Sequence, residues 1–373
     1  MNILIFSWRG PGHPESGGAE ISTHEHSKGW VSAGHTVTLF TSWYKGLKRQ
    51  EVIDGVNIIR SGNQNLGVHI HVFIWYCFRN HPKFDLVVDQ FHGIPFFTPF
   101  YVRTKKLGFI HEVAKEVWKL NQYVFPFNFI IAILGKLLEP LIFKIYKKVP
   151  FVTVSKSSKE ELVEWGIPRE NITVIHSGIK NSPLKKLPPK EKIKTLIYLG
   201  ALTKDKGIEE ALQCFSKLSR VSREWQFWVV GKVNTKYLMK LINFGKQLGI
   251  DKKIKFWGFV DEEKKFELLA KAHIAINPSI REGWGLVVIE AARVGTPTIA
   301  ANVPGLRDSI INGQTGILSD KLNGTSLATE VIKLFGDQEK YRQICKNAIL
   351  WSKKFSWDKS TTMSLKLIEK VAG

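Results

Sequence analysis

The sequence contains little cysteine: its 373 residues include only Cys77, Cys214 and Cys345, which lie far apart. This number and scatter are typical of reduced thiols in a cytoplasmic protein and argue against a secreted disulfide framework. No basic segment precedes the short apolar run at residues 1–8, so we expect a first strand there and no signal peptide. No low-complexity tract occurs in a chain that is 44% hydrophobic, which predicts a globular protein with cores to bury.

Acidic residues are also few, with 33 Asp and Glu against 54 Lys and Arg and a net charge of +21. This balance favours anionic partners, such as nucleotide diphosphates, anionic lipid surfaces or nucleic acid. The sequence has no zinc-ligand spacing, RRM-type motif or helix-turn-helix signature. Nucleic acid therefore comes last among these classes, and we expect no nucleic-acid partner.

No apolar run is long enough to predict a transmembrane helix. The most apolar stretch, residues 123–149, is interrupted by Pro126, Lys136, Glu139, Pro140 and Lys144, whereas a spanning helix needs ~20 largely uncharged residues. The favoured interpretation is a core helix packed on the first domain and preceded by a loop. The alternative is that residues 125–131, with Lys136, Lys144, Lys147 and Lys148 nearby, enter a membrane interface.

Short strand-like runs alternate with helical or loop patterns, which predicts an α/β fold with parallel, doubly wound sheets. The runs lie at residues 3–6, 36–41, 56–59, 85–88, 107–110, 151–154 and 172–175, and then at 195–200, 226–231, 254–258, 274–276 and 298–301. Between the two sets, a segment rich in Lys and Pro lacks apolar periodicity and predicts a linker. We expect an N-terminal domain at 1–180, a linker at 181–192, a C-terminal domain at 193–355 and a last helix at 356–373.

The stretch at residues 276–305 has the strongest chemical pattern: strand, glycine loop, helix, strand. Gly283 and Gly285 let backbone N–H groups approach a ligand, and the helix start behind them suits a phosphate or sugar hydroxyls. Glu282 and Glu290 would be ~12 Å apart along a continuous helix, whereas glycosidase carboxylates lie roughly 5 to 9.5 Å apart. Spacing alone favours two solvated carboxylates; the alternative is a pair that holds two ends of one extended ligand.

Other residues fall where open parallel sheets bind ligands. Gly17 and Gly18 precede the first helix, at the position of a phosphate-binding turn, and Lys206 lies in a strand-to-helix loop, where a cation can neutralise a diphosphate. His92 and His111 each follow a predicted strand. Each of these signals is weak alone, and His92 stays open between a structural and a functional role.

The stretch at 276–305 closely resembles the E-x7-E signature of the retaining nucleotide-sugar glycosyltransferases of family four (glycosyl transferases group 1). It contains Glu282-Gly283-Trp284-Gly285-Leu286, then Glu290-Ala291, Gly295-Thr296-Pro297 and Gly305. Residues 17–20 resemble the family's G-G-A-E loop, residues 111–112 its His-Asp, and residues 200–207 its G-R-L-x-x-x-K-G. The resemblance spans nearly the whole chain. It implies the GT-B fold, with two Rossmann-like doubly wound domains facing a cleft and a last helix that crosses back to the first domain.

The resemblance also implies roles for the site residues. The expected catalytic residues are Glu282 and His111, which would position the transferred sugar, and Lys206, which would stabilise the departing diphosphate. The expected donor-binding residues are Gly17, Gly18, Lys204, Gly231, Gly283, Trp284, Gly285, Leu286 and Glu290, of which Glu290 would bind the ribose.

One position departs from the family's pattern: Ala201 stands where the family usually has Arg, which removes one of two phosphate cations. Lys204 can substitute with a different geometry. No D-x-D occurs in the sequence, so we expect no metal and no cofactor beyond the nucleotide-sugar co-substrate. The expected partners are a nucleotide-diphosphate sugar, a glycan or lipid-linked acceptor, and an anionic membrane surface on the cytoplasmic side.

Two alternatives stay open. One is a nucleotide-sugar 2-epimerase of the same fold. The other is a non-catalytic nucleotide-sugar-binding protein, and the presence of Ala201 in place of the family's Arg favours this second alternative. A Rossmann dehydrogenase is disfavoured, because residues 10–18 do not give G-x-G-x-x-G directly after the first strand and no acidic residue closes the second strand.

Overall fold

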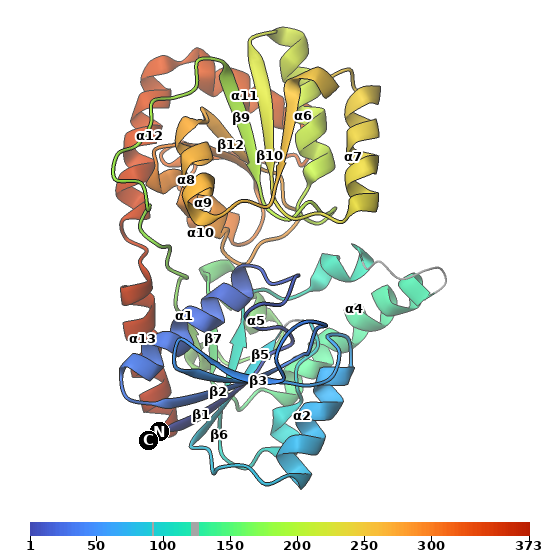
Figure 1. Ribbon diagram of the computed structural model, residues 1–373, viewed down its shortest axis with the longest axis vertical. Helices are drawn as coiled ribbons and strands as arrows, with labels where there is room; N and C mark the ends of the chain where they lie inside the picture. The colour runs from blue at the N-terminus through green and yellow to red at the C-terminus, as the bar shows by residue number, and fades with distance from the viewer. Residues whose placement is uncertain (92, 121–126) are drawn as a thin grey trace. The chain divides into compact units, whose positions relative to one another are not determined.

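The computed structural model describes residues 1–91, 93–120 and 127–373. They form two compact units: Met1–Gly178 with Ser356–Gly373, called unit 1, and Ile179–Phe355, called unit 2. Both units are built of alternating strands and helices (Figure 1). His92 and the beginning of the apolar stretch, residues 123–126, lie outside the described residues.

Unit 1, in its described part, contains an eight-stranded sheet in the order β3-β4-β2-β1-β5-β6-β7-β8. The strands are β1 (Asn2–Phe6), β2 (Thr36–Thr41), β3 (Gln50–Ile53), β4 (Val56–Arg60), β5 (Leu86–Phe91), β6 (Lys105–Ile110), β7 (Phe151–Thr153) and β8 (Ile172–Val174). All neighbours are parallel except β3 with β4. The edge strand β3 was not predicted, because none of its residues is buried and its Val52 is 65% exposed.

The helices of unit 1 cover both faces of this sheet. They are α1 (Gly18–Ser32), α2 (Gly67–Phe78), α3 (Thr98–Tyr101), η1 (Lys115–Leu120), α4 (Phe127–Ile145), α5 (Lys156–Glu164), η2 (Arg169–Asn171) and α13 (Trp357–Ala372). Alternate strand residues point to opposite faces. Leu4 and Phe6 of β1 accordingly pack with Val68 and Val72 of α2 on one face, while α1 and α13 lie on the other.

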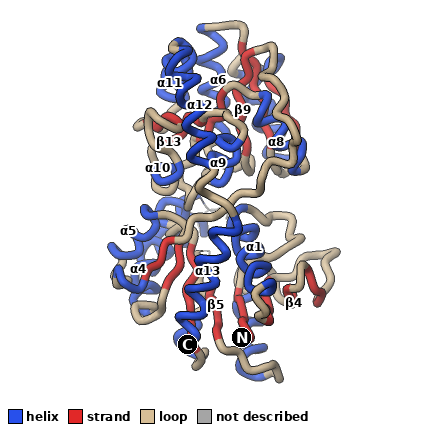
Figure 2. Tube along the Cα trace, turned by 90° about the vertical axis from the view of Figure 1, so that its left-hand side faces the viewer, coloured by secondary structure: helices blue, strands red, loops and turns tan. Residues whose placement is uncertain are grey.

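The last helix of the chain, α13, is fixed to unit 1 by side-chain hydrogen bonds. The Ser360 hydroxyl donates to the carbonyl of His176 at 2.6 Å. The Ser364 Oγ accepts from Trp30 Nε1 and lies 2.9 Å from both that atom and His26 Nδ1. Figure 2 shows α13 lying along the sheet beside α1.

Unit 2 contains an all-parallel six-stranded sheet in the order β11-β10-β9-β12-β13-β14. The strands are β9 (Lys194–Leu199), β10 (Trp225–Val230), β11 (Ile254–Gly258), β12 (Ile274–Asn277), β13 (Thr298–Ala301) and β14 (Gly316–Ser319). The helices are α6 (Ile208–Val221), α7 (Thr235–Gln247), η3 (Asp251–Lys253), α8 (Glu262–Lys271), α9 (Leu286–Arg293), α10 (Leu306–Ser309), α11 (Gly324–Gly336) and α12 (Gln338–Ser352).

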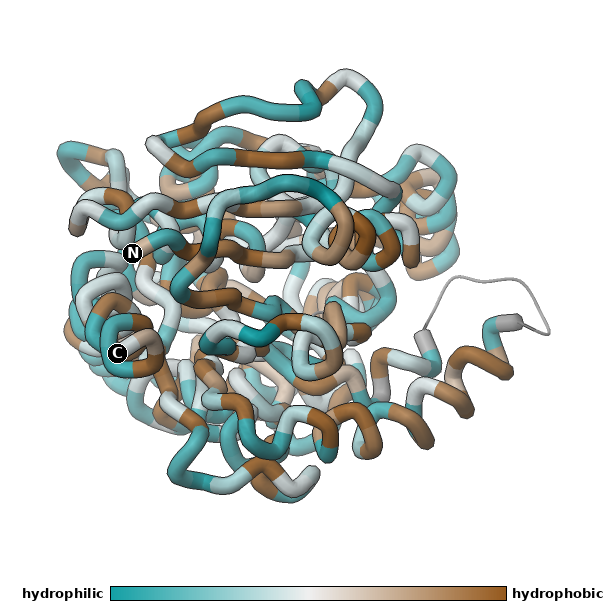
Figure 3. Tube along the Cα trace, turned by 90° about the horizontal axis from the view of Figure 1, so that it is seen from below, coloured by the Kyte–Doolittle hydropathy of each residue, from teal (hydrophilic) through white to brown (hydrophobic). Residues whose placement is uncertain are grey.

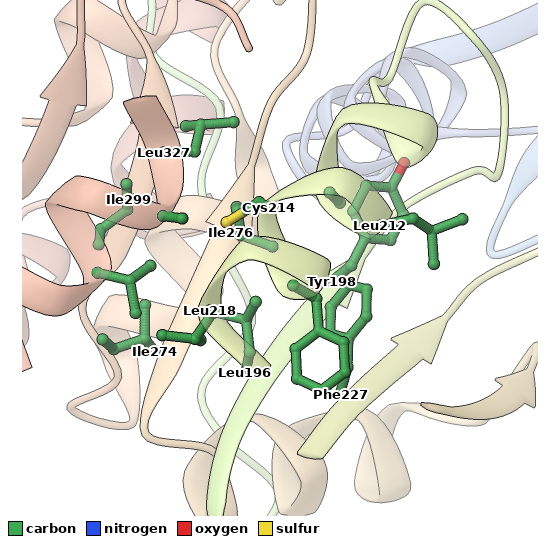
Figure 4. Close-up of a cluster of buried hydrophobic side chains, with 14 of the residues drawn as sticks. Leu196, Tyr198, Leu212, Cys214, Leu218, Phe227, Ile274, Ile276, Ile299 and Leu327 are labelled. Atoms are coloured by element: carbon green, nitrogen blue, oxygen red, sulfur yellow. The ribbon is translucent and has the colours of Figure 1, made fainter. Parts of the chain in front are cut away.

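The main core of unit 2 lies between its sheet and α6 and α11. Figure 4 shows Leu196 and Tyr198 of β9 beside Phe227 of β10, with Leu212 of α6 near them and Leu327 of α11 near Ile299 of β13. All six side chains are at most 2% exposed. Strands buried in this way consist of nearly continuous apolar residues, and this is why their positions could be predicted from short apolar runs.

These observations confirm the predicted α/β fold of two Rossmann-like parallel sheets. The three cysteines are free thiols. Within the described ranges, no helix combines the length and apolar character that crossing a membrane requires. The predicted core helix corresponds to α4, and that interpretation is only partly right: one side of α4 packs on unit 1, but many of its large apolar side chains are exposed.

Candidate active site

The central loop of unit 2 joins β12 to α9 at the carboxyl edge of the sheet, where open parallel sheets bind ligands. Asn277 ends the strand, and its Oδ1 accepts hydrogen bonds from the backbone N–H and the hydroxyl of Ser279, at 3.2 and 2.7 Å. The Ser279 Oγ also lies 2.9 Å from Glu282 Oε1, so its one hydroxyl hydrogen is shared between these two acceptors. The loop is therefore internally braced, and it presents Glu282 in a defined orientation.

Lys206 lies beside this carboxylate. Its Nζ is 3.1 Å from Glu282 Oε1 and 3.4 Å from the carbonyl oxygen of Arg281. The two side chains are only 26% and 19% exposed, so the ion pair is partly shielded from water. The structure thus brings together two of the three expected catalytic residues, although they are far apart in the sequence.

The loop that carries Lys206, between β9 and α6, is held against the Glu282 loop. The N–H of Ile280 donates to the carbonyl of Asp205 at 2.8 Å. From below, the buried Tyr198 hydroxyl lies 2.8 Å from the carbonyl of Ala201 and 3.2 Å from that of Lys206. Tyr198 is a supporting residue that the sequence analysis did not identify.

Two glycines allow the close approach of these loops. Gly207 has φ +69°, and a Cβ there would lie 2.0 Å from the carbonyl oxygen of Pro278. Gly305 has φ +79°, and a Cβ there would lie 2.2 Å from the carbonyl oxygen of Glu282. Both positions combine a left-handed backbone with a contact that excludes a side chain, so glycine is required at each.

Glu290, on α9, forms a second ion pair. Its Oε1 lies 2.8 Å from Nζ of Lys265 on α8, and the same ammonium lies 2.6 Å from Glu262. Burial raises the pKa of the Glu290 carboxyl, and the Lys265 ammonium offsets part of that rise. The structure therefore pairs each carboxylate of the E-x7-E pattern with a different lysine.

The remaining expected donor-binding residues of unit 2 surround these pairs. Gly285, with φ +80°, is the N-cap of α9, and Leu286 is the first residue of that helix. Next to them, Gly283 and Trp284 continue the loop, and the Trp284 ring packs edge-on against Phe355 with 4.9 Å between centroids. In addition, the N–H of Gly231, after β10, donates to the carbonyl of Gly258 at 2.9 Å, whereas the side chain of Lys204 is exposed.

The expected residues of unit 1 lie at the carboxyl ends of β1 and β6. Gly17 is the N-cap of α1, and its N–H donates to Glu20 Oε2 at 2.7 Å, while Gly18 begins the helix. The buried Glu20 is also 3.2 Å from Nε of Arg9, a further residue that the sequence analysis did not identify. His111 follows β6, and its ring stacks on that of Phe109 with 4.6 Å between centroids.

Among the described residues, no three His, Cys, Asp or Glu side chains are grouped so that they could hold a metal ion. The chemistry available at the Glu282 loop is instead that of an ammonium group, two carboxylates and the start of a helix. This combination suits a ligand with a diphosphate and several hydroxyl groups.

The comparison with protein families agrees with this geometry. Residues 180–351 match the model of glycosyl transferases group 1, and residues 16–182 match that of glycosyltransferase family 4. The chain belongs to these glycosyltransferases, and its fold is GT-B. The resemblance inferred from the E-x7-E motif is thereby confirmed.

The chain also resembles individual proteins over nearly its whole length. It is 26% identical to an uncharacterized glycosyltransferase of Methanocaldococcus jannaschii, with 96% of this chain and 95% of the relative covered. Among solved structures, it resembles sucrose-phosphate synthase from Thermosynechococcus elongatus, with a TM-score of 0.82, 19% identity and coverage of 99% and 98%. It also resembles the Anabaena protein HepE in complex with UDP and glucose, with a TM-score of 0.73, 17% identity and coverage of 99% and 100%. These structural similarities concern the fold.

Proposed function

We propose that this glycosyltransferase moves a hexose from a nucleotide-diphosphate sugar to a glycan or lipid-linked acceptor, with retention of anomeric configuration and without a metal ion. The observation that carries the proposal is the Lys206–Glu282 pair at 3.1 Å, held beside the start of α9. It places a cation for a leaving diphosphate next to a carboxylate that can hold the hydroxyls of the transferred sugar.

In this proposal the leaving group is stabilised electrostatically. Lys206 and the backbone amides of residues 283–286 meet the diphosphate as negative charge develops on it. The partial positive charge at the start of α9 adds to this effect. Because an ammonium group and amides supply the positive charge, a divalent cation is unnecessary.

The other residues position the donor. Glu282 and His111 orient the transferred sugar, and Glu290 accepts hydrogen bonds from the ribose hydroxyls. Lys265, which lies 2.8 Å from Glu290, orients that carboxylate and offsets part of the pKa rise that burial causes. Gly17 and Gly18 lie at the turn before α1, where backbone N–H groups can reach a phosphate.

We place this reaction on the cytoplasmic side of a membrane, in the synthesis of a cell-envelope glycan. The net charge of +21 favours both an anionic donor and an anionic lipid surface. A UDP-sugar is a candidate donor because the solved HepE structure, which shares the fold, contains UDP and glucose.

The test is a donor screen by nucleotide release. The purified protein is incubated with a panel of UDP-, GDP- and ADP-sugars, with and without a crude lipid extract, and the released nucleotide is measured. We expect release from one donor, rising with the extract, and its loss in Glu282→Ala. Glu330→Ala is the matched control, because Glu330 forms a Lys–Glu pair of the same 3.1 Å length on α11.

Silence across the whole panel, with donor binding still measurable by calorimetry, would contradict the proposal. It would favour the non-catalytic nucleotide-sugar-binding protein, for which Ala201 in place of Arg is the motivating observation. Ala201→Arg would then be the next variant, since it restores the second phosphate cation.

A further inference from the structure

Helix α4 is attached to unit 1 along one side. On that side the Glu139 carboxylate, only 2% exposed, accepts hydrogen bonds from the backbone N–H groups of Ala114 and Lys115 at 2.6 and 3.0 Å. It also accepts one from Nε1 of Trp118 at 2.7 Å. Gly135 allows Trp118 this close approach, since a Cβ there would lie 2.3 Å from the indole ring. The polar anchor of α4 therefore faces inward.

The opposite side of α4 is apolar and exposed. Its large side chains are between 37% and 62% exposed: Phe129, Ile130, Ile133, Leu134, Leu137, Leu138, Leu141 and Ile145. With 3.6 residues per turn, these positions fall within about half of the helix circumference. Figure 3 shows hydrophobic residues along the length of this helix. A helix at the surface of a protein normally carries polar residues on its outer side and apolar residues on its inner side. In α4 the outer side is apolar, and the buried carboxylate of Glu139 lies on the inner side.

Two neighbouring helices of unit 1, α2 and α3, carry further exposed apolar side chains. The Phe73 ring of α2 packs edge-on against Tyr101 of α3, with centroids 5.2 Å apart. At the other end of α3, the N–H of Thr98 donates to the hydroxyl of Tyr146, the residue that follows α4, at 3.1 Å. These short helices add Ile70, Ile74, Phe78 and Phe100, which are 57%, 44%, 73% and 71% exposed. We call these four side chains and the eight of α4 the apolar face.

The exposed charged residues of α4 and of the segment just after it have one sign. Lys136 and Lys144 of α4 and Lys147 and Lys148 after it are all exposed. The carboxylate of α4 is Glu139, which is buried on the inner side. An anionic surface that approached the outer side of α4 would therefore meet ammonium groups and no carboxylate of this helix.

We propose that the apolar face lies in the headgroup region of an anionic lipid bilayer, with α4 parallel to the membrane plane. The apolar side chains would enter the boundary between headgroups and acyl chains, while the lysines extend to the lipid phosphates. Soluble monomeric proteins rarely expose a contiguous apolar patch larger than a few hundred Å². An anionic bilayer suits both features of the apolar face. Its interface accommodates a long exposed apolar helix, and its negative charge complements that of the nearby lysines.

This inference extends the proposed function, on which it rests for the lipid-linked acceptor. A protein held at the membrane by unit 1 would meet an acceptor confined to the same surface. The docking itself needs neither donor nor catalysis, so the two proposals can fail separately.

The experiment is vesicle flotation of the full-length protein without nucleotide sugar. It uses vesicles of phosphatidylcholine alone and vesicles that also contain phosphatidylglycerol, at low salt. We expect flotation with the anionic vesicles.

In the first variant, Leu134, Leu137 and Leu141 are each replaced by Gln, which keeps the helix and removes apolar contact. We expect the partition coefficient of this variant onto the vesicles to fall at least about 10-fold. The control is Leu350→Gln on α12, where Leu350 is 62% exposed, and we expect wild-type flotation.

In the second variant, Lys144, Lys147 and Lys148 are each replaced by Gln. We expect its partition onto anionic vesicles to fall roughly 100-fold and its weaker partition onto neutral vesicles to stay unchanged. Flotation of the leucine variant at the wild-type level would overturn the inference, as would a wild-type protein that stays with the unbound fraction. A dimer in light scattering that the leucine substitutions abolish would also overturn it, because the face would then join two copies of the chain.

Discussion

Removing the Lys206 ammonium group should lower turnover strongly while leaving the fold intact. Its Nζ lies 3.1 Å from Glu282 and the side chain is 26% exposed. Loss of one preorganised electrostatic donor typically costs roughly 100- to 1,000-fold in kcat. Because water can reach this partly exposed position and replace some of the lost stabilisation, we expect Lys206→Ala to lose about 100-fold, at the lower end of that range.

The stability of the variant should change much less, since a partly exposed ion pair contributes about 1 kcal/mol or less. The assay is steady-state nucleotide release, which gives kcat and KM, together with thermal unfolding. Lys333→Ala is the matched control: Lys333 forms a 3.1 Å pair with Glu330 on α11 and is 66% exposed, so its kcat should equal that of the wild type. A wild-type kcat for Lys206→Ala would refute the role of this lysine.

Three further predictions concern other groups. Glu290→Ala should raise KM for the donor more than it lowers kcat, because Glu290 is assigned to the ribose; a loss confined to kcat would contradict this. Activity should persist in EDTA, whereas loss in EDTA with recovery on adding Mn²⁺ would show a metal requirement. Burial lowers the pKa of His26 from its usual 6.5 to about 4, so the unfolded chain binds this proton first as pH falls. The free energy of unfolding of unit 1 should therefore drop by about 3 kcal/mol between pH 6.5 and 4. In His26→Asn the drop measured by urea unfolding at the two pH values should be smaller than in the wild type by about this amount, and an equal drop in the variant would exclude His26 as a cause.

Most strands of the two sheets could be predicted from the sequence, because a strand that is buried on both faces consists of nearly continuous apolar residues. Every residue of β5 is buried, and its apolar residues formed a recognisable run. Strand β3 could not be predicted in this way, because it has no buried residues. It is held at the sheet edge by its backbone pairing with β4. The orientation of α4 was equally hidden. Glu139 looked like an interruption of an apolar stretch, whereas in the structure it anchors the helix through Trp118.

The candidate site was predictable where it depends on a local pattern, and less so where it depends on distant partners. Glu282 and Glu290 were identified from the motif itself. Lys265 and Arg9 were missed, although each lies within 3.2 Å of a carboxylate in the candidate sites, because neither position carries a local pattern. A lysine on a basic protein becomes informative only when the fold brings it to a buried carboxylate.

The most direct test of the account is to follow the sugar itself. The protein is supplied with the donor selected by the nucleotide-release screen, isotopically labelled in the sugar, together with the lipid extract. Mass spectrometry then locates the label. The account predicts that the label appears in an acceptor whose mass has increased by one hexose residue, in step with nucleotide release, and that Glu282→Ala gives neither. Label recovered only as free sugar in the aqueous phase, or as a 2-epimer of the starting sugar, would contradict transfer and would favour the epimerase alternative.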